Sequence, residues 1–316
     1  MTGQMKDFKK CITEKLLEYA ADLSNCFNIK AVMVYADVFR DKEFLDHFVA
    51  KLSETKLVLV SREKIEEELP DKVVVIKVPS IKLTRLGQMK VAVLVGVSQG
   101  IFHPEDVILC LSGIAESGII DSLFILDIGE EFEFFAVTQL EHLHEIVRPE
   151  VFLRVLEIAI DLSVEGREGK PVGTIFIVGD TEQVLKYCEQ LILNPFKGYA
   201  EEERNILDPR LEETVKEFAS LDGAFIIRGD GVIEAAGAFI RAGAVTEDIP
   251  SGLGARHRSA AAITAITQAV AITVSESTGT VMVFYGGKII MEIERPQFFG
   301  QPSGEQKLHG VHFAKD

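Results

Sequence analysis

The sequence has no tryptophan and only four cysteines. Single cysteines without a Cys-x-x-Cys pair or zinc-ligand spacing usually serve as small buried apolar side chains in a reducing compartment. The sequence therefore predicts neither a disulfide framework nor a zinc centre. The four are Cys11, Cys26, Cys110 and Cys188.

Basic residues are also scarce. The chain carries 33 lysines and arginines against 49 aspartates and glutamates, which gives a formal net charge of −16. This balance disfavours general binding to nucleic acids or to anionic membranes, because phosphate groups bind to positively charged faces. A triphosphate substrate would need a local cluster of cations or a metal ion.

Long apolar runs are missing as well. No window approaches about 18 uninterrupted apolar residues, and the first six residues lack the hydrophobic region of a signal peptide. We therefore expect a soluble, cytoplasmic protein without a membrane anchor. The length of 316 residues, with 47% hydrophobic residues, predicts two globular domains.

Short apolar segments alternate with candidate helices in the first half of the chain. The candidate helices include residues 42–52 and 112–120. Fully apolar strands separated by helices predict a parallel sheet that is covered on both faces, and hence an α/β layer domain. The expected strands are residues 31–35, 57–60, 73–78, 91–97 and 123–128.

A helical pattern over residues 139–164 follows, with Pro149 suited to a first helical turn. We place the domain boundary before this helix, so that the first domain spans residues 1–142 and the second spans residues 143–316. Residues from 295 onward are expected to form a loose extension.

Tight turns mark two hairpins in the second half. Asp230-Gly231 and Gly286-Gly287 each lie between strand-like segments, and two-residue turns of this kind favour hairpins. The other expected elements are a strand at 174–178 and helices at 211–220 and 257–270. The sequence thus predicts an α/β domain with a mixed sheet flanked by helices.

Asp222 stands directly before Gly223, Ala224 and an apolar strand. Two such small residues let a flat ring or a ribose approach the backbone. The carboxylate can bind a metal ion or accept a proton from a hydroxyl. An aspartate in an ordinary turn is the competing interpretation of these three residues.

A basic triplet opens an alanine-rich helix: Arg256, His257 and Arg258 follow Gly254 and Ala255. A helix N-terminus presents free N–H groups and a positive dipole end, which bind anions. Residues two apart on a helix point about 200° apart, so the two arginines are not expected to bind the same phosphate. A solvated basic helix start is the alternative.

Ser275 and Glu276 end another apolar strand, where Glu276 is either a second metal ligand or part of an ordinary turn. Two further segments have structural interpretations. Asp180 follows a strand and is expected to cap a helix. His142 and His144 diverge on a helix, so they are expected to be solvated linker residues rather than metal ligands.

In their order and spacing, these segments resemble the diadenylate cyclase domain. The resemblance spans roughly residues 150–294. The first half, notably residues 83–88 and 111–114, looks like the carboxy-terminal domain of pyruvate kinase, and this pairing is similar to the archaeal form of the cyclase. The segments that carry the resemblance are Asp222-Gly223-Ala224, Gly254-Ala255-Arg256-His257-Arg258 and Val274-Ser275-Glu276.

The resemblance implies a reaction and a set of roles. Two ATP molecules would be condensed into cyclic di-AMP and two pyrophosphates, with Mn²⁺ or Mg²⁺ and with Mn²⁺ favoured. Asp222 would lie near the attacking 3′-hydroxyl and bind the metal ion together with Glu276, while Arg256, His257 and Arg258 would contact phosphates. The nucleotide would be bound at Gly223, Ala224, Gly254, Ala255, Ser275 and Glu276.

The resemblance also implies an assembly: each subunit would hold one ATP, and two subunits would face each other in a homodimer or higher homo-oligomer. A non-catalytic sensor of adenine nucleotides or cyclic dinucleotides is the alternative function. Asp222 argues against this alternative, because a pure binder has little use for a carboxylate beside a triphosphate. The first domain could bind a small effector or serve as an assembly surface.

Overall fold

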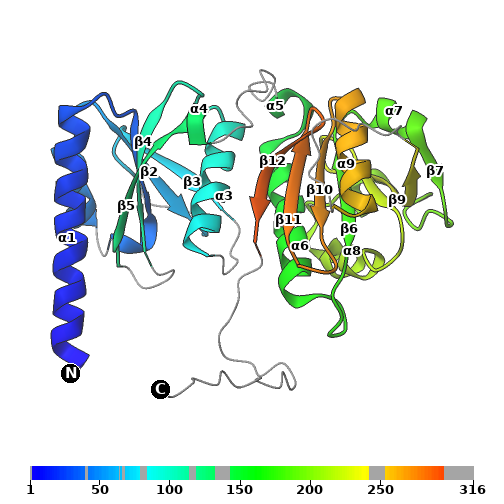
Figure 1. Cartoon of the computed structure of the whole chain (residues 1–316), viewed down its shortest axis with the longest axis horizontal. Coiled ribbons are helices and arrows are strands. Elements are labelled where there is room, and N and C mark those ends of the chain that lie inside the picture. The colour runs from blue at the N-terminus through cyan, green and yellow to red at the C-terminus, as the bar shows by residue number, and fades with distance from the viewer. Residues whose placement is uncertain are drawn as a thin grey trace, which may run out of the picture.

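The computed structural model describes residues 2–39, 42–63, 65, 68–78, 84–113, 119–131, 143–241 and 253–294. His142 lies outside these ranges, and so does the extension expected from residue 295 onward. Two β-sheets, one from each half of the chain, are separated by helices (Figure 1). Within the described ranges, no helix has the length and apolar character needed to cross a bilayer.

The first sheet has the strand order β3-β2-β1-β4-β5. Its first four strands are parallel, as predicted, but β5 pairs antiparallel with β4 at the edge. The α/β class is therefore confirmed, with a sheet that is mixed rather than purely parallel. The strands are β1 (Ala31–Tyr35), β2 (Lys56–Ser61), β3 (Val73–Lys77), β4 (Val107–Ser112) and β5 (Ser122–Asp127).

The prediction of a strand at residues 91–97 is wrong, because these residues lie in helix α3 (Arg85–Ser98). The Thr84 side chain caps this helix by accepting a hydrogen bond from the Gly87 N–H at 3.1 Å. Most of its residues are buried, so its apolar run is continuous rather than periodic. A short continuous run of this kind does not distinguish a buried strand from a buried helix.

The prediction of a helix at residues 112–120 is wrong at both ends of this range, which are the parts of it that the structure describes. Ser112 is the last residue of β4, and residues 119 and 120 are neither helix nor strand; residues 114–118 lie outside the described ranges. β4 itself is not among the predicted strands.

Two helices cover the outer face of the first sheet: α1 (Thr2–Cys26), which the sequence reasoning did not anticipate, and α2 (Lys42–Lys51), which it did. Leu17 of α1 and Phe48 of α2 pack with Val32 and Leu57 in one buried cluster. This face therefore has its own core.

The cysteines are less buried than predicted. Cys110 in β4 is buried and Cys188 is partly buried, whereas Cys11 and Cys26 on α1 are exposed. The prediction fails for these two because α1 buries only one of its faces. Burial raises the pKa of the Cys110 thiol to about 12, so it stays protonated as an apolar side chain.

The second sheet is mixed, as predicted, and has the order β12-β11-β10-β6-β8-β9-β7. Both predicted hairpins are confirmed: Asp230-Gly231 connects β8 to β9, and Gly286-Gly287 connects β11 to β12. The strands are β6 (Thr174–Val178), β7 (Cys188–Gln190), β8 (Ala224–Ile227), β9 (Ile233–Ile240), β10 (Val270–Val274), β11 (Val281–Tyr285) and β12 (Lys288–Ile293).

Helices cover both faces of this sheet. α6 (Pro149–Glu165) and α8 (Glu212–Phe218) pack on one face, and α9 (Ala255–Ile266) packs on the other. The expected helix at 257–270 thus ends earlier, before β10. The short helices are α4 (Ile128–Glu131), α5 (Leu143–Ile146) and α7 (Thr181–Val184), with 3₁₀ turns at Ala36–Val38, Leu185–Tyr187, Glu201–Arg204 and Pro209–Leu211.

The two halves share a middle layer of helices. α3 and α6 lie between the two sheets (Figure 1), and α3 packs against both α6 and β12. Met33 in β1, Leu94 in α3, Val155 in α6 and Phe176 in β6 belong to one continuous buried cluster. The two sheets therefore share one hydrophobic core. The domain boundary between residues 142 and 143 stays a prediction.

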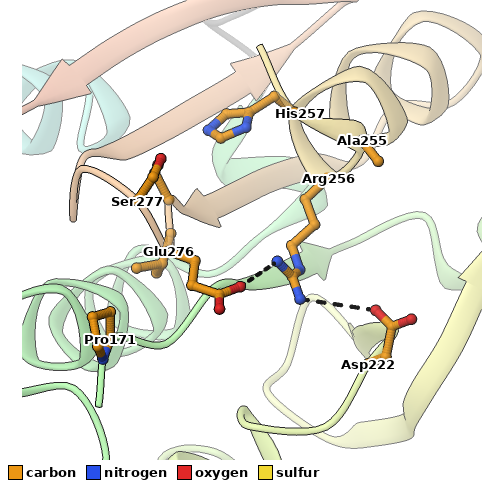
Figure 2. Close-up of a pocket in the computed structure, with 10 residues that line it drawn as sticks. Pro171, Asp222, Ala255, Arg256, His257, Glu276 and Ser277 are labelled. Carbon is orange, nitrogen blue, oxygen red and sulfur yellow. Dashed lines mark hydrogen bonds and ion pairs between the residues drawn. The ribbon is translucent and has the colours of Figure 1, made fainter. Parts of the chain in front are cut away.

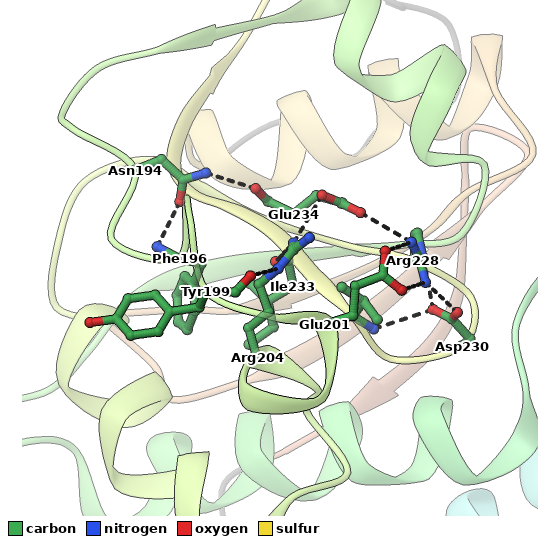
Figure 3. Close-up of polar contacts among 10 residues, drawn as sticks. Asn194, Phe196, Tyr199, Glu201, Arg204, Arg228, Asp230, Ile233 and Glu234 are labelled. Atoms are coloured by element: carbon green, nitrogen blue, oxygen red, sulfur yellow. Dashed lines mark hydrogen bonds and ion pairs between the residues drawn. The ribbon is translucent and has the colours of Figure 1, made fainter.

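Polar contacts tie the loop before α8 to the β8–β9 hairpin (Figure 3). Arg228 donates to both carboxylate oxygens of Glu201, at 2.7 and 2.8 Å, and to Asp230. Arg204 donates to the Ile233 carbonyl at 2.6 Å and to Glu234 at 2.9 Å. These contacts hold the hairpin that carries the residues after Asp222.

Candidate active site

Three strand ends meet at one edge of the second sheet. β8 runs parallel to β6, and β10 runs antiparallel to β6 on its other side. The residues before β6, those before β8 and those after β10 therefore lie together. Through this pairing, Asp222 and Glu276 come close although 54 positions separate them in the sequence.

A cavity of about 630 Å³ opens at this edge, and the N-terminus of α9 forms part of its wall (Figure 2). Seven of the predicted site residues line it, as do three that the sequence reasoning did not assign. The predicted ones are Asp222, Gly254, Ala255, Arg256, His257, Ser275 and Glu276, and the others are Pro171, Val274 and Ser277.

Arg256 stands between the two carboxylates. Its Nη1 donates to Glu276 Oε2 at 3.3 Å, and its Nη2 lies 3.8 Å from Asp222 Oδ1 (Figure 2). Gly173 makes this arrangement possible, since a Cβ atom there would lie 2.6 Å from Arg256 Nη1 and 2.8 Å from Glu276 Cβ. A side chain at position 173 would therefore push the guanidinium away from the carboxylates.

The carboxylates are open to solvent. The side chain of Asp222 is 86% exposed and that of Glu276 is 63% exposed, whereas that of Arg256 is 33% exposed. The cavity of one copy thus presents its acidic groups outward rather than enclosing them.

The start of α9 provides backbone N–H donors that its N-cap residue does not satisfy with a side chain. Gly254 is the N-cap residue and has no side chain to satisfy the first N–H groups. Free first-turn N–H groups and the positive end of the helix dipole suit a phosphate. Arg258 points elsewhere: its Nη1 donates to the Leu253 carbonyl, and it does not line the cavity. Arg256 and Arg258 thus have different partners in the structure, and the predicted contacts of both with phosphates stay a prediction.

His257 is 6% exposed and lies in the cavity wall beside Phe284, at 6.2 Å between ring centroids. Within the described part of the chain, neither of its ring nitrogens has a hydrogen-bond partner. Burial lowers its pKa, and the nearby charge of Arg256 lowers it further, so the imidazole is neutral at pH 7. A buried polar ring without a partner is available to a ligand.

Gly223 and Ala224 do not line the cavity. Gly223 has a φ of +107°, and a Cβ atom there would lie 2.5 Å from the backbone of Gly237 in β9. Its small size is therefore needed for packing between strands as well as for the left-handed backbone. Ala224 begins β8 and is buried. At neither position does the structure show open space in which a ring or a ribose could approach the backbone, as the sequence suggested.

Asp180 does not cap the helix that follows it, contrary to the prediction. Its Oδ2 instead accepts a hydrogen bond from the Gln268 N–H at 2.9 Å, just before β10. The carboxylate therefore links two strands that are neighbours in the sheet but distant in the sequence.

Asp222 and Glu276 are the carboxylates that could hold a metal ion here. Across the described ranges, no set of three or more His, Cys, Asp or Glu side chains is placed to hold one. A site of two carboxylates fits Mg²⁺ or Mn²⁺, because such ions often bind one or two carboxylates and complete their shell with substrate phosphates and water. The guanidinium between the carboxylates already shows that the site attracts a cation.

Two family models match the chain. Residues 161–289 match the model described as "DisA bacterial checkpoint controller nucleotide-binding", and residues 13–136 match "Probable sensor domain DacZ_P". The first range contains the whole cavity edge from Pro171 to Ser277.

Two proteins named diadenylate cyclase are similar over long stretches. The one from Methanocaldococcus jannaschii is 28% identical over 303 residues, which cover 90% of this chain and 97% of that protein. The one from Haloferax volcanii is 38% identical over 203 residues, which cover 63% of this chain and 71% of that protein. A crystal structure of DacA from Staphylococcus aureus covers 44% of this chain and 84% of its own, with 22% identity and a TM-score of 0.29, too low to compare folds.

Proposed function

This chain belongs to the diadenylate cyclase family, and we propose that the cavity around Asp222, Arg256 and Glu276 is where it makes its product. It condenses two ATP molecules into cyclic di-AMP and releases two pyrophosphates, with a divalent metal ion. The observation that carries the assignment of the site is the meeting of two carboxylates, a guanidinium and a helix N-terminus at one sheet edge.

The cationic side of the cavity suits the triphosphate. Arg256 and the first N–H groups of α9 offer positive charge and hydrogen-bond donors that are fixed before the substrate arrives. Preorganised donors of this kind stabilise the charge that develops at a phosphorus centre. Ser275 and the neutral His257 lie at the same wall and can donate further hydrogen bonds.

The acidic side suits the attacking hydroxyl. The 3′-oxygen of one nucleotide forms a bond to the α-phosphorus of the other, the bond to the pyrophosphate oxygen breaks, and the hydroxyl proton leaves. Asp222 orients this hydroxyl and accepts its proton. Asp222 and Glu276 would hold Mn²⁺ or Mg²⁺, with Mn²⁺ favoured, and the ion would neutralise phosphate charge.

One copy supplies half of the chemistry. The exposed carboxylates of Asp222 and Glu276 face out of the molecule, where a second nucleotide would have to be presented. We therefore propose that two copies face each other across this cavity in a homodimer or higher homo-oligomer, each holding one ATP. The likeness of the first domain to the carboxy-terminal domain of pyruvate kinase stays a prediction.

Incubation of the purified protein with ATP and Mn²⁺, followed by mass spectrometry, tests the proposed site. We expect the wild type to make cyclic di-AMP and Asp222→Asn to make at least about 100-fold less, since general base catalysis contributes about that much. Asp71→Asn, an exposed aspartate of the first domain, is the control and should retain full activity. Equal activity of Asp222→Asn and wild type would refute the role of Asp222.

A wild-type protein that binds ATP but makes no cyclic dinucleotide at any protein concentration would instead support the non-catalytic sensor. The face-to-face arrangement has a separate test. Specific activity should fall on dilution, in the same concentration range in which light scattering shows the oligomer dissociating. Constant specific activity of a dissociated monomer would contradict the shared site.

A further inference from the structure

A second cavity lies between the two halves of the molecule, away from the active site. Its volume is about 270 Å³. Arg62 and Lys77 line it from the first sheet, and Glu150, Arg154 and Glu157 line it from α6. The described site residues around Asp222 take no part in it.

The first sheet contributes cations at a position where ligands commonly bind. Arg62 follows β2 directly, and Lys77 is the last residue of β3. The two strands are parallel, with Ser61 paired to Lys77, so both side chains stand at the carboxyl edge of the sheet. Open α/β sheets bind ligands in the crevice outside the carboxyl ends of their strands.

The opposite wall belongs to α6. Glu150, Arg154 and Glu157 recur at helical spacing and therefore lie on one face of this helix. Arg154 is held in place by Glu157, at 3.0 Å, and by Glu212 of α8, at 2.7 Å. Its charge is thus balanced by two carboxylates, one of which lies outside the cavity.

We propose that this cavity binds a small organic or inorganic anion that carries a carboxylate or a phosphate group. Arg154 is already paired with Glu157 and Glu212, so the two cations at the carboxyl edge of the first sheet, Arg62 and Lys77, are the ones that point to an anion. Arg62 and Lys77 bind the oxyanion, and Leu153 and Leu207 contact the rest of the ligand. The volume of about 270 Å³ corresponds to about nine water molecules, which is room for a small carboxylate or phosphate compound.

The cavity is connected to the active site through one short helix. Arg154 binds Glu212, the first residue of α8, and α8 ends four residues before Asp222. A helix of seven residues spans roughly 10 Å. An anion bound by Arg62 and Lys77 also attracts the neighbouring Arg154. It thus competes with Glu212 for Arg154 and weakens the contact between α6 and the start of α8, where, among the described residues, Lys216 alone then holds Glu212. This step rests on the proposed function, whereas the binding of the anion does not.

Calorimetry on the full chain tests the binding. The active site is first filled with a non-hydrolysable ATP analogue and Mg²⁺, and inorganic phosphate and succinate are then titrated separately. We expect at least one of them to bind, and Lys77→Gln and Arg62→Gln to weaken that binding at least ten-fold. Lys56→Gln is the matched control, because Lys56 is exposed at the opposite end of β2. The proposal is overturned if neither anion binds, or if both cavity variants bind as the wild type does.

Cyclase assays then test the connection. A saturating concentration of the bound anion should lower the wild-type rate at least two-fold and leave the Lys77→Gln rate unchanged. An unchanged wild-type rate with the anion bound would refute the path through Arg154. The inactive Asp222→Asn variant should still bind the anion, so a failure of the proposed active site is distinguishable from a failure of this second site.

Discussion

At the scale of single residues, Arg256 lies between Asp222 and Glu276 and offsets their charge in the free protein. The proposed function gives it a second role, the binding of phosphate when the nucleotide is bound. We therefore expect Arg256→Gln to bind Mn²⁺ more tightly than the wild type when no nucleotide is present. The gain should be roughly two- to five-fold, because exposed ion pairs are worth up to about 1 kcal/mol.

The same variant should lose about 100-fold or more of its cyclase activity, because a preorganised donor at the phosphate is gone. Calorimetric titration with Mn²⁺ alone measures the first effect, and product formation measures the second. Arg258→Gln is the control, since Arg258 donates to a backbone carbonyl outside the cavity and should leave the Mn²⁺ affinity unchanged. Weaker Mn²⁺ binding by Arg256→Gln would contradict this account.

Gly173 is a second residue whose role is local. A methyl group there would collide with the Arg256 guanidinium and with Glu276. We expect Gly173→Ala to lower cyclase activity at least about ten-fold through this misplacement, while the melting temperature changes by only a few degrees. Full activity of this variant would show that the contact of Arg256 with Glu276 is dispensable.

The chemical side chains of the site could be predicted from the sequence, and the residues that shape it could not. Asp222, Arg256 and Glu276 carry charges next to strand or helix ends, which is a local signal. Gly173 and Pro171 act through strand pairing: β6 lies between β8 and β10, and nothing near residue 173 indicates those neighbours. Gly223 was identified, but the reason is its contact with Gly237.

At the scale of elements, the β8–β9 hairpin depends on a charged turn. Hydrogen bonds from Arg228 lower the pKa of Asp230, so its carboxyl group is more acidic in the folded protein than in the unfolded chain. A carboxyl group whose pKa is lowered by folding stabilises the folded state at every pH above its ordinary pKa of about 4. That stability is lost as the pH falls through the folded-state pKa.

Asp230→Asn should therefore lower the melting temperature at pH 7 and have a smaller effect at pH 3. The loss at pH 7 should correspond to roughly 1 kcal/mol at most, because the pair is partly exposed. Thermal unfolding at several pH values measures it, with Asp71→Asn as an exposed control. If the difference in melting temperature between variant and wild type grew on acidification, the expected direction of the pH dependence would be wrong.

Elements were predictable where their sequence pattern is local. Hairpin turns, helix starts and isolated apolar strands could be located, as β1, β6 and the β11–β12 hairpin show. The sequence of residues 91–97 predicts a strand rather than part of α3 because both faces of this helix are buried between the sheets, which removes the helical periodicity. The sequence of β5 does not indicate that this strand runs antiparallel to β4, because the direction of a strand depends on the path of the chain that leads to it.

At the scale of the whole molecule, the two halves depend on each other. α3 covers apolar surface of α6 and β12, and one buried cluster includes both sheets. A fragment of residues 143–316 would expose that surface to water. We expect this fragment to bind a hydrophobic dye and to unfold at a lower temperature than the full chain, because the burial contributes about 25 cal/mol per Å². A fragment as stable as the full chain would contradict the shared core.

The patterns of strands, helices and turns correctly indicated the α/β fold class, but not the layer of helices that the two sheets share. Contacts such as Leu94 with the cluster around Val155 join segments from different halves of the chain. A local pattern shows that a helix is apolar on all sides and does not show which partner covers it. The cavity lined by Arg62 and Glu150 could not be predicted for the same reason.

The shared layer also sets an order of events during synthesis on the ribosome. The first sheet is complete once β5 has been made at Asp127, but β12, which α3 contacts, ends only at Ile293. At 5–20 residues per second, the intervening 293 − 127 = 166 residues take roughly 10 to 30 seconds. During that interval α6 is made, but the surface of α3 that β12 covers stays exposed to water on the nascent chain, and we expect a chaperone to bind there.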